Sequence, residues 1–60
     1  MKLKEVLRHI PARQYLRLQE SLHIVAMGYP ESDDIKQHEN KTVGLITIES
    51  GTLQISVYTK

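Results

Sequence analysis

The sequence contains no cysteine among its 60 residues, which excludes disulfide bonds, thiolate chemistry and zinc sites built on sulfur. It also lacks a long apolar run, since no stretch approaches the ~18 residues that a transmembrane helix requires. No signal-peptide pattern opens the chain, so we expect a cytoplasmic protein that does not act at a membrane. A chain of this length forms one domain, over residues 1–60, and its stability must come from packing or from a partner.

Aromatic residues are also scarce, at 5% of the chain, and charge is unevenly distributed although the net charge is only +1. Residues 1–17 are basic, whereas residues 18–40 are acidic. Nucleic-acid-binding domains usually combine a strongly basic surface with aromatic residues for stacking, but only Tyr15 lies in the basic stretch. Nucleic-acid binding is therefore an alternative function and not the leading one. The cations that it would use are Lys2, Lys4, Arg8, Arg13 and Arg17.

Apolar residues open the chain at helical spacing. Pro11 lacks the N–H that would continue a helix, so the pattern predicts about two helical turns that end near Ile10. A helix this short is not stable alone in water and must dock on the rest of the fold. Its apolar face consists of Leu3, Val6, Leu7 and Ile10.

Alternating apolar residues then predict two strands, over residues 14–19 and 22–27. A two-residue turn between them would place apolar residues opposite polar ones. The pattern therefore favours a three-residue loop at residues 19–21. This loop pairs Leu18 with Leu22 and Leu16 with Ile24.

A second hairpin is predicted, because the residues of its turn and the alternation of its flanking strands indicate the same strand pairing. Residues 43–49 and 52–59 flank Ser50-Gly51, and Gly51 can take the positive φ that a two-residue turn needs. On one face, Ile48 pairs with Leu53, Ile46 with Ile55, and Gly44 with Val57. On the other face, Val43 lies opposite Tyr58 and Leu45 opposite Ser56.

Residues 28–42, between the hairpins, are predicted to form a loop with one short helix. Ser32 is suited to cap that helix, and Ile35 and His38 would point inward. The whole sequence predicts an α+β domain in which a short N-terminal helix packs on a four-stranded antiparallel sheet made of two hairpins. The predicted core is Leu3, Val6, Leu7, Ile10, Leu16, Leu18, Leu22, Ile24, Ile46, Ile48, Leu53, Ile55 and Val57.

No group of residues indicates catalysis or metal binding. The histidines His9, His23 and His38 lack the spacing of a metal motif. The adjacent Asp33 and Asp34 would diverge on a helix, where they interact with its positive end. No serine lies in a nucleophile-elbow context, and no glycines form a phosphate-binding loop. We therefore expect a protein that is not an enzyme and that uses no metal, cofactor or small-molecule substrate.

The second face of the predicted sheet carries a surplus of apolar residues, and clustered exposed apolar residues usually mark a contact surface. This face could be covered by a different protein, by a second copy of the chain, or by residues 28–42 with Ile35 as the cover. Free sheet edges offer a further route, by addition of a strand. The apolar residues on this face are Tyr15, Val25, Met27, Val43, Leu45 and Tyr58. The predicted protein-binding residues are Tyr15, Arg17, Met27, Leu45 and Tyr58, with Tyr, Met and Arg being types enriched in interfaces.

The opening residues 1–11, followed at once by the strand of residues 14–18, and the tight hairpin of residues 45–57 resemble small accessory proteins of bacteriophages and integrative elements. The pattern is similar to anti-CRISPR inhibitors built from one short helix and a small antiparallel sheet. The resemblance implies a protein-binding inhibitor of a host defence complex in the host cytoplasm. Many such inhibitors are acidic mimics of DNA. This chain is not acidic, so the resemblance implies surface blocking or dimer-mediated inhibition, and it assigns no site residue.

Overall fold

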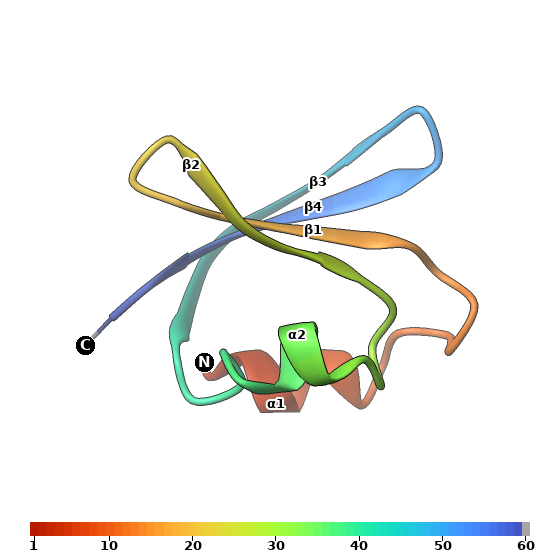
Figure 1. Cartoon of the computed structure of the whole chain (residues 1–60), viewed down its shortest axis with the longest axis horizontal. Helices are drawn as coiled ribbons and strands as arrows, with labels where there is room; N and C mark the ends of the chain where they lie inside the picture. The colour runs from red at the N-terminus through yellow and green to blue at the C-terminus, as the bar shows by residue number, and fades with distance from the viewer. Residues whose placement is uncertain (60) are drawn as a thin grey trace.

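The computed structural model describes residues 1–59 and confirms the predicted α+β class, with two short helices packed against one face of a sheet (Figure 1). The elements are α1 (Leu3–Leu7), β1 (Leu16–Glu20), β2 (His23–Gly28), α2 (Asp33–Lys36), β3 (Thr42–Glu49) and β4 (Thr52–Tyr58). The helix face of the sheet carries Leu16, Leu18, Ile55 and Val57, and the opposite, open face carries Arg17, Gln19, Gln54 and Ser56. Neither of these helices is long and apolar enough to cross a membrane.

The sheet is mixed, which corrects the prediction of a purely antiparallel sheet. The strand order is β2-β1-β4-β3, so the two hairpins meet through β1 and β4, and these two strands run parallel. Leu16 lies opposite Leu53 and Leu18 opposite Ile55 in this parallel pair. Each turn determines the antiparallel pairing within its own hairpin. How the hairpins join depends instead on residues 28–42, which return the chain across the helix face.

The first hairpin closes with a two-residue turn and not with the predicted three-residue loop. Ser21 and Leu22 occupy the turn with φ of 53° and 69°, and Glu20 pairs with His23 across it. Both turn residues lie in the left-handed region, which is typical of the type I′ turns that suit hairpins. Leu22 is therefore 89% exposed at the tip of the hairpin, and its predicted place in the core is wrong.

A bulge at Val25 shifts the register of β2 against β1 beyond the turn and so changes which residues of β2 face the core. Gln19 pairs with Ile24 and Leu18 pairs with Ala26, so Val25 is the extra residue on β2. Ile24 consequently lies on the open face and is 56% exposed, which corrects its predicted place in the core. Val25 packs against the core instead of pointing to the second face, and Ala26 is buried.

The second hairpin has the predicted turn, in which Ser50 and Gly51 have φ of 51° and 80°. The predicted pairs Ile48–Leu53, Ile46–Ile55 and Leu45–Ser56 are confirmed. Nearer the start of β3 the register shifts, and Gly44 is the extra residue of a second bulge.

Because of this bulge, the predicted pairing of the residues nearer the start of β3 is wrong. Val43 lies opposite Val57 and Thr42 opposite Tyr58, so Gly44 does not pair with Val57 and Val43 does not pair with Tyr58. The Tyr58 ring lies close to Gly44, where an added Cβ would sit 3.2 Å from Tyr58 Cε1. Val43 packs against the core and not, as predicted, on the second face.

The core lies between the sheet and the helices, and Ile35 of α2 points into it as predicted. Helix α1 is shorter than predicted, because after Leu7 the chain continues in tighter turns in which the Ile10 N–H donates to the Leu7 carbonyl at 3.3 Å. Ile10 still packs against the core. Ser32 does not cap α2 with its side chain, because its hydroxyl accepts the Tyr29 N–H at 3.0 Å. The buried core residues are Leu3, Val6, Leu16, Leu18, Ala26, Ile35, Ile55 and Val57.

Candidate protein-binding surfaces

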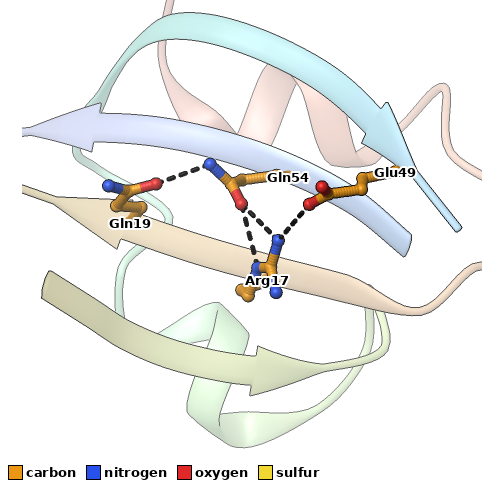
Figure 2. A network of polar contacts seen from close by, with 4 residues as sticks. All are labelled: Arg17, Gln19, Glu49 and Gln54. Carbon is orange, nitrogen blue, oxygen red and sulfur yellow. Dashed lines mark hydrogen bonds and ion pairs between the residues drawn. The ribbon is translucent and has the colours of Figure 1, made fainter. Parts of the chain in front are cut away.

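A network of polar side chains crosses the middle of the open face (Figure 2). Arg17 on β1 donates from Nε to Gln54 Oε1 at 2.9 Å and from Nη2 to Glu49 Oε1 at 3.2 Å. The Gln54 side-chain amide donates in turn to Gln19 Oε1. Because Arg17 lies opposite Gln54 in the parallel strand pair, the network joins the two hairpins. Arg17, predicted as a contact residue, is thus held by hydrogen bonds within the sheet.

The other predicted contact residues lie on either side of this network. Met27 on β2 and Tyr15 just before β1 lie on one side, where Tyr15 packs edge-to-face with Tyr29 at 5.4 Å between ring centroids. Leu45 and Tyr58 lie on the other side, on β3 and β4. All four predicted residues are exposed. Polar side chains separate the two pairs, so these residues do not form one continuous apolar patch.

Residues 28–42 do not cover the open face, which contradicts the alternative of an internal cover with Ile35. Helix α2 lies on the helix face, and Ile35, the expected cover, is part of the core. Val25 and Val43 also pack against the core. The open face is therefore uncovered by residues 1–59, but it carries fewer apolar side chains than the sequence predicts.

A more apolar exposed surface lies along β3. Ile46 and Ile48, which the sequence places in the core, are 43% and 72% exposed on the helix face. The predicted burial of Ile46 and Ile48 is wrong because α1 and α2, with only five and four residues, are too short to cover them. The β3–β4 hairpin extends beyond both helices (Figure 1). On the open face Leu45 is 62% exposed. Apolar side chains are therefore exposed on both faces of one strand.

This strand also lies at the end of the sheet, since β3 is last in the strand order. The N-terminal residues cover the start of its outer side: the Val43 N–H donates to the Met1 carbonyl at 2.8 Å, and Lys2 forms a β-bridge with Thr42. From Leu45 to Glu49, β3 pairs with β4 on its inner side, and no strand of the described chain lies on its outer side; we call this run the open edge. The other edge strand, β2, is bulged, and bulges discourage strand addition.

The cations of the basic N-terminal third do not form one surface. Arg17 lies on the open face, whereas Lys2 and Lys4 belong to the α1 region on the helix face and Arg13 lies in the exposed loop before β1. An open cleft of about 510 Å³ lies between α1 and α2, and its charges are of both signs. The charged residues that line it are Lys4, Arg8, Lys36, Glu31 and Glu39. The predicted cations are thus divided among the open face, the α1 region and the loop before β1.

The titratable groups with shifted pKa values have structural roles. Glu20 Oε1 pairs with Lys41 Nζ at 2.6 Å, and Glu20 Oε2 accepts from the Thr59 N–H and hydroxyl. The hydrogen bonds from Lys41 and Thr59 hold the pKa of Glu20 below its ordinary value of 4.5. Burial lowers the pKa of His38 below 6.5, and its Nδ1 is buried without a partner in residues 1–59. Within the same residues, no group of three His, Cys, Asp or Glu side chains could hold a metal ion.

The chain matches no protein-family model, no curated protein and no solved structure.

Proposed function

We propose that the protein is a non-enzymatic protein-binding module that accepts an extended segment of a protein chain along β3. The observation that carries this proposal is the open edge, Leu45–Glu49, which exposes apolar side chains on both faces of the sheet. An added strand would bond to the free backbone groups of the edge and would cover Leu45 on one face and Ile46 and Ile48 on the other. Natural edge strands are usually protected by charged residues, Pro or a bulge. Within Leu45–Glu49 there is no Pro and no bulge, and the one charged residue is Glu49, next to the turn.

The resemblance to anti-CRISPR inhibitors suggests the role of such a module. Strand addition uses backbone hydrogen bonds and a few apolar side chains, so it can block a protein surface without catalytic groups. A net charge of +1 does not imitate DNA. We therefore propose that the protein inhibits a host defence complex of the CRISPR type by covering one of its protein surfaces.

The test is co-elution of the purified protein with purified CRISPR effector complexes on a sizing column. We expect co-elution with at least one complex. Leu45→Asp should weaken binding about tenfold or more, a loss of about 1.4 kcal/mol, because it places a charge in the strand interface. Leu22→Asp makes the same substitution at the exposed turn outside β3 and should bind like the unaltered protein.

Two results would contradict this proposal. Absence of co-elution with every effector complex would contradict the inhibitor role. Co-elution that a folded Leu45→Asp variant leaves unchanged would contradict β3 as the binding site.

A further inference from the structure

The open edge is short and has a defined centre. Its start is limited by the bulge at Gly44 and by Met1, whose carbonyl accepts the Val43 N–H. Its end is limited by the turn to β4. The regular, uncovered run is therefore Leu45–Glu49, and Thr47 is its middle residue.

The direction of the backbone groups along this run follows from the hairpin register. In a hairpin closed by a two-residue turn, the residues that flank the turn, here Glu49 and Thr52, form a hydrogen-bonded pair, and such pairs alternate along the ladder. Thr47 consequently directs its backbone groups toward β4. Ile46 and Ile48 direct theirs outward, so a strand added at the open edge would bond to these two residues.

We propose that this strand is β3 of a second copy of the chain, paired antiparallel about a two-fold axis at Thr47. The inference rests on the proposed function, because it takes the same open edge as a site of strand addition. The second copy and a segment of another protein would compete for this edge, so the dimer has to dissociate before the other protein binds. In this register Ile46 of each copy lies opposite Ile48 of the other, so the outward backbone groups of both copies bond to one another. The four isoleucine side chains, exposed in the single chain, then cover one another on the helix face.

Charge favours the antiparallel over the parallel orientation of the second copy. Glu49 is the one charged residue in the run Leu45–Glu49. Antiparallel pairing about Thr47 places the two Glu49 carboxylates at opposite ends of the interface, whereas parallel pairing would place them side by side with a repulsive interaction.

The geometry of the hairpin leaves room for this pairing. The β3–β4 hairpin projects beyond α1 and α2 (Figure 1), so the helices of the chain leave Ile46 and Ile48 uncovered. A single strand is a smaller interface than the ~800 Å² per partner of standard complexes. We therefore expect a weak dimer that forms reversibly with rising concentration.

Analytical ultracentrifugation over a concentration series measures this equilibrium. Ile48→Lys should raise the dissociation constant about tenfold or more, because the charged side chain would face Ile46 of the second copy. The fold should tolerate this change at a residue that is 72% exposed. Leu22→Lys is the matched control at the exposed turn and should dimerise like the unaltered protein. A monomer at every concentration into the millimolar range overturns the proposal, as does a dimer that the folded Ile48→Lys variant leaves unchanged.

A cysteine on the two-fold axis tests the register independently, since the chain has no other cysteine. Two Thr47 residues would form a non-hydrogen-bonded pair with Cα atoms ~4.5 Å apart, within the range of a disulfide. Thr47→Cys should therefore form a covalent dimer on mild oxidation. In Leu45→Cys the two cysteines would lie four positions apart along the strands, ~14 Å, and cross-linking should be poor. Equal cross-linking of the two variants, or none for Thr47→Cys, overturns the register.

Different experimental results would contradict self-pairing and the proposed function. A monomer that co-elutes with an effector complex through β3 shows that the open edge accepts a different protein, and self-pairing is then wrong. A dimer with the expected Thr47→Cys cross-link that co-elutes with no effector complex supports self-pairing and contradicts the inhibitor role.

Discussion

Arg17 and Gln54 lie opposite each other in the parallel pair of β1 with β4, and Arg17 Nε donates to Gln54 Oε1 at 2.9 Å. The two residues are 37 positions apart, so this contact forms only when the two hairpins join. Gln54 also donates to Gln19. Glu49 adds an ion pair to Arg17, but its side chain is 74% exposed. Gln54 is therefore the residue through which the network connects the hairpins.

Gln54→Ala should lower the free energy of unfolding by about 1–2 kcal/mol, because it leaves the part-buried polar groups of Arg17 and Gln19 without their partner. Glu49→Ala should cost less than about 1 kcal/mol, because an exposed ion pair is weakened by solvent. Urea denaturation measures both changes. Thr47→Ala, opposite Gln54 on β3 but outside the network, serves as the control. Equal losses for Gln54→Ala and Glu49→Ala would contradict the central position of Gln54.

Leu22→Gly should stabilise the protein. Leu22 has φ of 69°, in the left-handed region that is unfavourable for a side chain with a Cβ and that glycine adopts freely. We expect a gain of about 0.5–1 kcal/mol, seen as a rise of a few degrees in Tm by circular dichroism. His23→Gly, at the neighbouring strand position, should instead lower Tm. A lower Tm for Leu22→Gly would argue against the observed turn.

Gly28→Ala should destabilise the end of β2. Gly28 has φ of 154°, and an added Cβ would lie 2.9 Å from the Ser32 hydroxyl, which accepts the Tyr29 N–H. The strain and the close contact should together cost about 1–3 kcal/mol in denaturant unfolding. Gly44→Ala is the control, because its Cβ would meet the exposed Tyr58 ring at 3.2 Å, and that ring can turn aside. The prediction fails if the two alanine variants lose the same stability.

His38 should make the protein less stable as the pH falls below 6.5. Burial, with a smaller contribution from the charge of Lys41, holds the pKa of His38 below 6.5, against opposing effects of Glu20 and Asp34. Between that lowered pKa and 6.5 the unfolded chain binds more protons than the folded protein, so the free energy of unfolding decreases as pH falls. Chemical denaturation at a series of pH values measures this slope. His38→Gln should remove it, and an unchanged slope in that variant would contradict the prediction.

Protonation of Glu20 should lower the free energy of unfolding separately, in more acidic solution. The hydrogen bond from Lys41, followed by that from Thr59, holds the pKa of Glu20 below 4.5. Its contribution is therefore complete above pH 4.5 and is lost as pH falls through the lowered pKa. Glu20→Gln should remove this acidic part of the profile. It should keep the part that depends on His38 and extend it to lower pH, because the Glu20 charge that raises the pKa of His38 is gone. Loss of both parts in Glu20→Gln would show that the two groups do not act separately.

Local chemistry is enough to predict several elements of this fold. The Ser50-Gly51 turn and the pairing of Ile48 with Leu53 follow from the positive φ available to glycine and from the alternation of the flanking strands. Pro11 lacks the N–H that would continue the first helical segment past Ile10, although α1 itself already ends at Leu7. Each of these features depends on residues that are close together in the sequence.

The candidate site depends on contacts between distant residues. The sequence indicated that Leu45 is exposed, but it placed Ile46 and Ile48 in the core, because alternation shows which residues share a face and not whether another element covers that face.

The sequence by itself determined the α+β class, the second hairpin and its turn. Only the tertiary structure decided the parallel junction of β1 with β4, the bulges at Val25 and Gly44, and the open edge along β3. These features depend on how far two helices of five and four residues extend across the sheet, and on which strands the connecting segment brings together. The reach of the helices and the joining of the strands both result from packing between distant residues, so the periodicity of a single strand does not predict them.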